Sequence, residues 1–225
     1  MKVKLISHSQ PTSSTSFDYG WKTLEDVVAY SARVSNPSNQ NNSETSSKLL
    51  QYLVKHGHWS PFEMASICLE IETTRDIARQ ILRHRSFSFQ EFSQRYADPT
   101  KELGFVTREA RLQDLKNRQN SIEMADDNEV INEFYSVQAK VLRASRDAYD
   151  WAIRNCIAKE QARSVLPEGL TESRMYMNGT VRSWMHYIDL RSAHGTQKEH
   201  MEIARACADV IKPIFPMIMD FINDK

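Results

Sequence analysis

The densest group of side chains suited to chemistry lies between residues 80 and 96. Three arginines, Arg83, Arg85 and Arg95, stand here beside Glu91 and several hydroxyls. The planar guanidinium binds phosphate oxygens in pairs, and a glutamate accepts hydrogen bonds from ribose hydroxyls. The group therefore indicates a site for an anion that carries a polar ring. On spacing alone, a basic helix end followed by a solvated strand explains the same residues equally well.

The spacing within this group predicts how its side chains point. Glu91, Ser93 and Arg95 alternate, so in an extended segment their side chains face one way, towards one ligand. Gln80 lies three residues before Arg83 at the end of a predicted helix, so both can share a helical face.

A second group is the segment 56–63, which reads HGHWSPFE. Two histidines separated by one residue are a familiar metal spacing, but no further His or Asp ligand lies nearby, so metal binding is disfavoured. His56, His58, Ser60 and Glu63 can instead cover a planar ring. In the alternative interpretation His56 ends a helix and His58 only packs.

A third group lies nearer the C-terminus. Arg182, His186 and Asp189 have helical spacing and fall on one face of a predicted helix. Arg163 precedes a Leu-Pro pair, which would put it at a helix C-terminus, where its charge is favoured. The alternative is that Arg182 and Arg191 are ordinary surface charges, the commoner fate of an arginine.

Hydrophobic periodicity predicts the elements that must hold these groups in the first half of the chain. Residues 35–47 read as a polar surface loop. Gly57 is expected to end a helix, and Thr73 or Thr74 to cap the next one, with Asp76 in its first turn. The predicted elements are a strand at 2–7, helical spacing over 24–31, a helix at 47–56, a half-buried strand at 65–72 and a helix from about 73 to 83.

The second half is predicted to be helical. One or two helices are expected over 128–162, with further helices over 172–190 and 197–211. Strands early and helices late favour an α+β or mixed α/β fold. We expect a single domain, 1–225, with a central mixed or antiparallel sheet packed with long helices. The residues predicted to face inward from 128–162 are Ile131, Phe134, Val141, Ala148, Ala152 and Cys156.

Composition excludes several classes of protein. The chain has 29 Lys and Arg against 29 Asp and Glu, whereas a general nucleic-acid binder shows a basic excess. The three cysteines are far apart, which fits a reducing compartment. The absence of a long apolar run and of a signal peptide favours a cytoplasmic protein without a membrane partner. Six glycines, none in a G-x-G spacing, exclude a Rossmann fingerprint and a Walker A loop.

All three groups together resemble the signature segments of the flavin-dependent thymidylate synthases. The family motif R-H-R, seven residues, then S is present from Arg83 to Ser93 and continues to Tyr96. The segments come in the family's order and span most of the chain. The other matching segments are H-G-H-x-[ST]-P-F-E at 56–63, A-R-V-S at 32–35, A-R-x-V-L-P at 162–167 and R-S-x-M…L-R at 182–191, followed by Gln197 and Glu199.

The resemblance implies a reaction and its ligands. A methylene group passes from methylenetetrahydrofolate to C5 of dUMP, reduced FAD supplies the hydride, and NADPH reduces the flavin again. The family forms homotetramers whose active sites lie where subunits meet. No metal is implied, and a zinc-dependent hydrolase using His56 and His58, or a nucleotide-binding module without chemistry, stay as alternatives.

Motif positions carry the family's site residues onto this chain. Arg191 would be the catalytic residue: it would contact the uracil and favour its N3-deprotonated form, which raises electron density at C5. Arg163 would reach dUMP from a different subunit. The implied FAD residues are His58, Ser60, Arg83, His84, Arg85, Glu91, Thr180, Val181, Arg182 and His186. The implied dUMP residues are Gln80, Arg83, Glu91, Phe92, Ser93, Gln94, Arg95, Arg163 and Arg191.

The chain departs from the family pattern at several of these positions. Gln90 stands where Asn is usual, and Phe92 and Gln94 replace common Leu and Gly. Backbone groups can make those contacts. Thr180 and His186 stand where Asn is frequent, which bears on the flavin contacts expected there.

Overall fold

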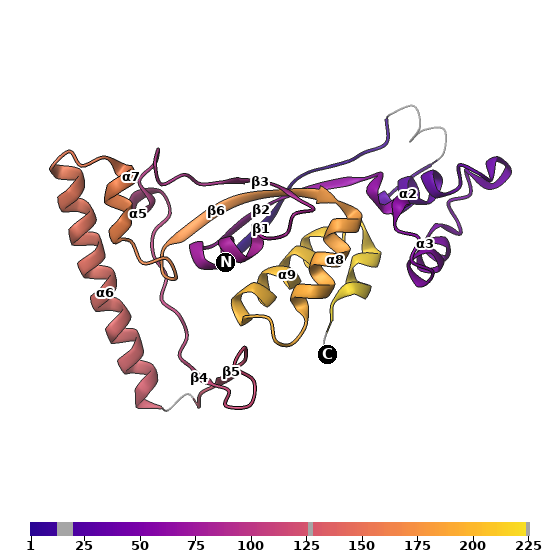
Figure 1. Ribbon diagram of the computed structural model, residues 1–225. Coiled ribbons are helices and arrows are strands. Elements are labelled where there is room, and N and C mark those ends of the chain that lie inside the picture. The colour runs from indigo at the N-terminus through magenta and orange to yellow at the C-terminus, as the bar shows by residue number, and fades with distance from the viewer. Residues whose placement is uncertain (13–19, 126–127, 224–225) are drawn as a thin grey trace.

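An antiparallel sheet forms the centre of the computed structural model, which describes residues 1–12, 20–125 and 128–223 (Figure 1). Within these residues the sheet has four strands in the spatial order β1-β2-β6-β3. Each neighbouring pair runs antiparallel, which confirms the α+β fold with its central antiparallel sheet. The strands are β1 (Lys2–His8), β2 (Ser66–Thr74), β6 (Glu172–Thr180) and β3 (Ser88–Glu91).

Helices pack against one face of this sheet, and others extend from both of its ends (Figure 1). The helices under the sheet are α8 (Val181–Ser192), α9 (Lys198–Ile211) and the 3-10 turn η4 (Pro216–Phe221). The remaining elements are α2 (Leu24–Ala32), η1 (Pro37–Asn39), α3 (Ser46–Lys55), η2 (Ser60–Glu63), α4 (Arg75–Ile81), α5 (Pro99–Glu102), β4 (Arg111–Gln113), β5 (Ser121–Glu123), α6 (Glu129–Arg154), α7 (Lys159–Ala162) and η3 (Arg163–Val165).

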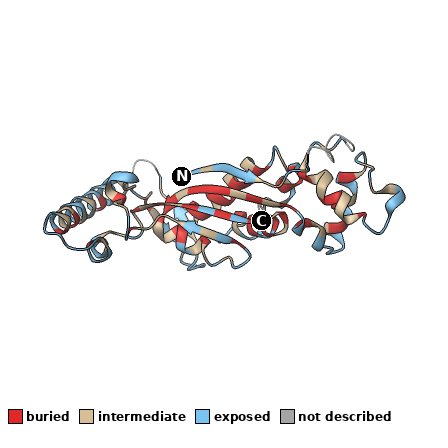
Figure 2. Cartoon of the chain, turned by 90° about the horizontal axis from the view of Figure 1, so that it is seen from above, coloured by how far each residue is buried: buried red, intermediate tan, exposed pale blue. Residues whose placement is uncertain are grey.

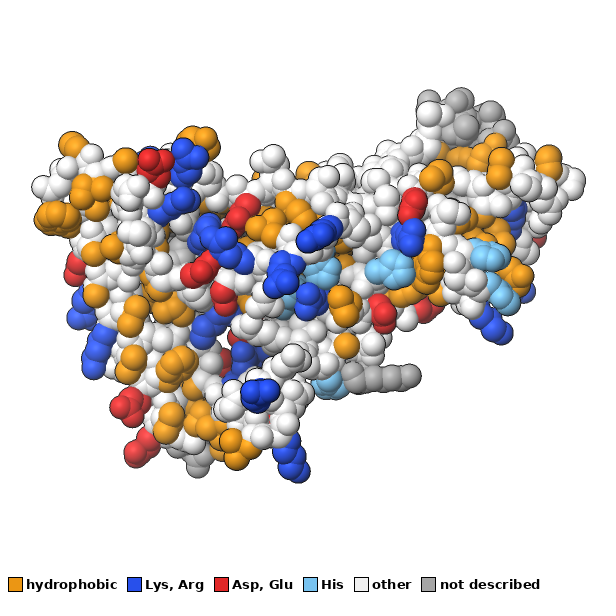
Figure 3. Space-filling model, in the orientation of Figure 1, with side chains coloured by type: hydrophobic (Ala, Val, Ile, Leu, Met, Phe, Trp, Pro, Cys, Tyr) orange, Lys and Arg blue, Asp and Glu red, His pale blue; other side chains and the backbone are white. Residues whose placement is uncertain are grey.

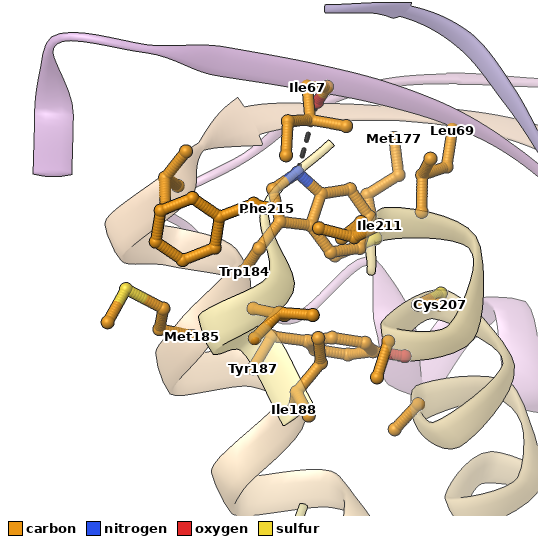
Figure 4. Close-up of a cluster of buried hydrophobic side chains, with 14 of the residues drawn as sticks. Ile67, Leu69, Met177, Trp184, Met185, Tyr187, Ile188, Cys207, Ile211 and Phe215 are labelled. Carbon is orange, nitrogen blue, oxygen red and sulfur yellow. Dashed lines mark hydrogen bonds between the residues drawn. The ribbon is translucent and has the colours of Figure 1, made fainter. Parts of the chain in front are cut away.

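The core lies between β2, β6 and the two helices beneath them. Alternate residues of β2 are buried as predicted, with Ile67 and Leu69 opposite Gly179 and Met177 of β6. Trp184 of α8 fills the space below and donates its indole N–H to the carbonyl of Ile67 at 3.0 Å (Figure 4). This bond satisfies the indole's only polar atom, so the largest core side chain also ties α8 to the sheet.

The predicted helix over 172–190 is wrong in its first half. Residues 172–180 form strand β6, and the helix begins only at Val181. Ser173, Met175, Met177 and Gly179 are buried while their neighbours are less so, which is the period of a strand. Methionine favours helices, but a position between β2 and β3 imposes the extended conformation.

The apolar stripe predicted to face inward on α6 is largely uncovered. Phe134 and Val141 are 40% and 43% exposed, and Cys156 beyond the helix is also exposed. Ala152 is buried, in a small cluster with Tyr149. Figure 2 shows this helix at one end of the molecule, mostly in the colours of exposed and intermediate residues. The helix was predicted correctly, but most apolar residues of its first half are exposed in the part of the chain that the structure describes.

The other predicted elements of the first half are confirmed to within a few residues at each end. Gly57 has a φ of 68°, the left-handed conformation that ends α3. Thr74 is the N-cap of α4, and its hydroxyl donates to Asp76. All three cysteines are free. No helix among the described residues combines the length and apolar composition needed to cross a membrane.

Candidate functional site

Strand β6 runs into helix α8 without a loop, and this junction positions the third group. Thr180 is the last residue of β6 and the N-cap of α8, where its Oγ1 accepts from the N–H of Ser183 at 3.3 Å. Val181 is buried, and its N–H donates to the carbonyl of Ala65 at 2.9 Å. The Thr180 cap and the hydrogen bond from Val181 to Ala65 therefore fix where α8 begins. The side chain of Val181 is buried and is not available to a ligand.

His84 and Arg191 form the central pair of the candidate site. Arg191 Nε donates to His84 Nε2 at 2.9 Å, so His84 Nε2 carries no proton and the ring is neutral with its hydrogen on Nδ1. Burial, and then the charge of Arg191, lower the pKa of His84 to about 4. The ring of Tyr187 meets His84 edge-on, with centroids 4.9 Å apart. A neutral histidine thus orients an arginine without neutralising it.

Gln80 belongs to a second set of hydrogen-bonded side chains next to this pair. Its Nε2 donates to Gln197 Oε1 at 2.8 Å, and its Oε1 lies 3.2 Å from His200 Nδ1. His200 Nε2 lies 3.1 Å from the hydroxyl of Tyr187. Residues far apart in sequence, from α4, α8 and α9, therefore meet here.

Residues of η2 and α8 lie side by side and form a shelf suited to a planar ring. The exposed ring of His186 packs against Trp59 with centroids 4.5 Å apart and the two planes tilted by 56°. Arg182 NH1 pairs with Glu63 at 2.5 Å, with both side chains about half exposed. Ser60 is exposed beside them. We call the surface formed by Trp59, Ser60, Glu63, Arg182 and His186 the ring shelf.

Positive side chains extend from the ring shelf across the same face. Figure 3 shows Lys and Arg side chains across the middle of this face, over α8, with histidines among them. Arg83 and Arg85 are exposed on either side of His84. His58 is exposed too, 6.3 Å from His56 between ring centroids.

A cavity of about 370 Å³ near the end of the first group is suited to an anion. Its lining includes Arg75, Arg79, Arg163 and Gln94. Gln94 is 3% exposed, and its Nε2 has no hydrogen-bond partner among the described residues. A buried amide without a partner costs free energy, so a ligand oxygen that reached it would stabilise it. Glu160 and Glu168 line the cavity too, and Arg79 pairs with Glu168, so a phosphate would bind the arginines in exchange for these carboxylates.

The first group is not extended along its whole length as predicted. Strand β3 ends at Glu91, which accepts from Ser173 Oγ at 2.8 Å and lies 3.5 Å from Arg75 NH1. The N–H of Phe92 still donates to the carbonyl of Arg174, but the carbonyl of Ser93 then accepts from two residues of a turn. The predicted alternation of Glu91, Ser93 and Arg95 is therefore wrong beyond Glu91.

The turn brings Arg95 next to Glu160. Arg95 NH2 lies 3.3 Å from Glu160 Oε2, next to the cavity that Arg163 and Gln94 line. Arg163 and the first group thus meet within one chain. The turn at Ser93 shows no proline or glycine, the usual signals of a turn.

Four residues of this region were not among those predicted from the sequence. Arg75 and Arg79 line the cavity, while Tyr187 and His200 are buried behind Gln80 and His84. The two arginines had a signal, because they stand four residues apart on α4 and so share one face of it. Nothing in the sequence pairs His200 with a residue 120 positions earlier.

Metal ligation has no support in the part of the chain that the structure describes. No group of three or more His, Cys, Asp or Glu side chains is placed there to hold a metal ion. His56 instead packs on Tyr52 with ring centroids 4.2 Å apart. A zinc-dependent hydrolase would need a third ligand beside His56 and His58, and no described residue is placed to provide one.

Comparison with known proteins shows what this chain is similar to. A family model described as thymidylate synthase complementing protein matches residues 19–217. A probable flavin-dependent thymidylate synthase of Paramecium bursaria Chlorella virus 1 is 46% identical over 218 residues, 97% of each chain. The flavin-dependent thymidylate synthase of Synechocystis sp. is 47% identical over 218 residues, with the same coverage.

The fold is similar to that of a solved structure. The UMP/dUMP methylase PolB from Streptomyces cacaoi, bound with 5-Br UMP, superposes with a TM-score of 0.78. The identity is 24%, and the superposition covers 98% of this chain and 92% of the other. At this identity the likeness concerns the fold.

Proposed function

Because the chain belongs to the family of flavin-dependent thymidylate synthases, we propose that it converts dUMP to dTMP. Methylenetetrahydrofolate is the carbon donor, FAD carries the hydride, and NADPH is the reductant. The enzyme is thus a methyltransferase of dTMP biosynthesis that depends on a flavin. The whole chain, 1–225, acts as one catalytic domain.

The pair of His84 and Arg191 is the observation that supports this chemistry most directly. Only the Nε–H of Arg191 is used by His84, which leaves four N–H groups for a ligand. Arg191 forms no ion pair with any described residue, so its charge is not cancelled within that part of the chain. A fixed positive charge in a partly dry site stabilises negative charge on a substrate.

In the proposed mechanism Arg191 binds the uracil ring and favours its N3-deprotonated form. The electron density that this leaves at C5 prepares that atom to attack the methylene carbon. No cysteine nucleophile is required, and none of the three cysteines belongs to the three groups described above. Neutral His84 holds Arg191 in place throughout and neither gives nor takes a proton at Nε2.

The proposed dUMP site joins Arg191 to the cavity of Gln94. The unpartnered amide of Gln94, with Arg75, Arg79 and Arg163, fits a nucleotide phosphate. Arg95 lies at the rim through its pair with Glu160. The other residues assigned to dUMP from the family motif are Gln80, Arg83, Glu91, Phe92 and Ser93.

The proposed FAD site is the ring shelf together with the exposed residues around His84. His186 on Trp59 offers an aromatic surface, and Arg182 and Ser60 offer hydrogen-bond donors at its edge. Arg83 and Arg85 can neutralise a pyrophosphate, which the chain must do with side chains because it has no glycine-rich loop. FAD, when bound, supplies the hydride to the methylene carbon. His58, His84, Glu91 and Thr180 complete this set, and Val181 is left out because its side chain is buried.

We also propose that the protein acts as a homotetramer. The exposed residues Val130, Phe134, Val137 and Val141 follow one another on α6 at intervals of four and three, the spacing of a helix-packing seam. An exposed apolar stripe of this kind indicates contact with another chain. Light scattering tests this directly, since an active monomer would contradict active sites shared between subunits.

The reaction is tested on the purified protein. A yellow preparation that releases FAD on denaturation, and that forms dTMP from dUMP with methylenetetrahydrofolate and NADPH, is the expected result. A colourless preparation that contains zinc would refute the proposal. A flavin-free protein that binds dUMP without turnover would favour the nucleotide-binding module.

A further inference from the structure

Five side chains form one continuous line of hydrogen bonds behind the proposed dUMP site. From the Tyr187 hydroxyl the line passes through His200, Gln80 and Gln197 to the carboxylate of Glu199. The heavy-atom separations are 3.1, 3.2, 2.8 and 2.9 Å in that order. Tyr187, Glu199 and His200 are buried, so little water can replace a broken link.

The carboxylate of Glu199 fixes the direction of this line. Its Oε1 lies 2.6 Å from Arg111 NH2 and 3.3 Å from Arg108 NH1. Burial works to raise the pKa of Glu199, but its own backbone N–H, Arg108, Gln197 and Arg111 outweigh burial and hold that pKa below its ordinary value. An ionised carboxylate only accepts hydrogen bonds, so Gln197 must turn its NH₂ group towards it.

Each further link follows from that one. With its NH₂ on Glu199, Gln197 presents its oxygen to Gln80, so Gln80 must donate from Nε2. The oxygen of Gln80 then faces His200, which must carry its proton on Nδ1, and His200 Nε2 accepts from the Tyr187 hydroxyl. Turning the Gln80 amide by 180° would put two acceptors against each other on one side and two donors on the other.

From this geometry we propose that His200 is a positioning residue that, together with Gln197, locks the carboxamide of Gln80 in one orientation for the nucleotide. The proposal rests on the proposed function, which puts Gln80 on dUMP. Gln80 is half-buried, so the remaining amide hydrogen and the second lone pair of its oxygen are free for a ligand. A locked amide presents its donor and acceptor in a fixed order, whereas a free one loses entropy on binding.

The test compares two substitutions of His200 in the FAD-loaded enzyme. His200→Leu removes the Nδ1–H donor, while His200→Asn keeps an N–H group near the same place. We expect His200→Leu to raise the dissociation constant and KM for dUMP about 3- to 10-fold, the effect of one hydrogen bond, with kcat within about twofold. His200→Asn should restore most of the affinity.

A double-mutant cycle separates positioning from general loss of structure. In a Gln80→Ala background, His200→Leu should have no further effect on the dissociation constant for dUMP, measured by calorimetry. FAD content and thermal unfolding report whether each variant is folded. Equal effects of His200→Leu with and without Gln80, or no effect in either background, would overturn the proposal.

Activity of the unsubstituted enzyme distinguishes failure of the positioning role from failure of the proposed function. If the unsubstituted enzyme binds no FAD and forms no dTMP, the proposed function fails. If it forms dTMP and the cycle shows no coupling between His200 and Gln80, only the positioning role fails.

Discussion

Replacing Arg191 by alanine removes the charge on which the proposed mechanism depends. The substitution should leave the fold intact, because the buried side chains of α8 are others, among them Trp184 and Tyr187. It should therefore leave FAD bound and abolish most dTMP formation.

The size of the effect follows from what Arg191 contacts. Removing one preorganised donor that stabilises developing charge typically costs about 3–4 kcal/mol, a factor of roughly 10²–10³ in kcat. The loss is expected in kcat rather than in KM if the charge acts mainly in the transition state. Arg191→Lys keeps a charge but loses the planar fork and the Nε–H that meets His84, so its rate should fall between the two.

The same substitution has a signature in the pKa of His84. Burial and the charge of Arg191 both lower that pKa to about 4, so alanine at 191 removes the second cause and leaves the first. The pKa should rise but stay below the ordinary value of about 6.5. Titration of the His84 ring by NMR measures it.

The assay is single-turnover dTMP formation with FAD content measured in the same samples. Turnover of Arg191→Ala within about twofold of the unsubstituted enzyme, with FAD retained, would remove Arg191 from catalysis. An unchanged pKa of His84 would refute the pairing of the two side chains.

Further predictions concern packing, cysteines and pH. Gly179→Ala should destabilise the protein by about 1–3 kcal/mol in denaturant unfolding, because its new methyl group would lie 2.4 Å from Phe87. Gly169→Ala is the matched control, since its nearest neighbour would be at an ordinary 3.8 Å. Alanine at all three cysteines should leave dTMP formation within a few-fold; its loss from a folded, yellow protein would revive a thiol mechanism. Burial, then Arg191 and His84, lower the pKa of His200 to about 3, whereas the unfolded chain has a value near 6.5. Between these values the unfolded state binds the extra proton, so the free energy of unfolding falls by about 1.4 kcal/mol for each unit by which the pH is lowered, and His200→Asn should remove that pH dependence.

Local patterns predicted those parts of the fold that depend on local forces. The buried apolar residues of β2, the glycine that ends α3 and the start of α4 after Thr74 are short-range effects, and each is present in the structure, although Glu70 is buried too and Thr74 makes no side-chain cap hydrogen bond. Local patterns did not predict strand β6. Its methionines favour a helix, and only its position between two other strands makes it extended.

In the candidate site, too, local sequence predicted some features, while others depend on distant residues. Arg182 and His186 lie on one exposed face of α8 because their spacing is that of the helix. The turn after Ser93 and the contact of His200 with Gln80 depend on residues distant in sequence, and no local pattern encodes them. The pattern on α6 predicted an amphipathic helix, but it could not say that most of the apolar face would be exposed in this chain.

The loop-free junction of β6 and α8 makes chain length itself a determinant of the site. One residue inserted at Thr180 would turn every later position of α8 by about 100°, since a helix has 3.6 residues per turn. Trp184 would leave the core, and Arg191 would no longer face His84. A deletion would have the opposite rotation and the same result. We therefore expect insertions and deletions at this junction to be rejected.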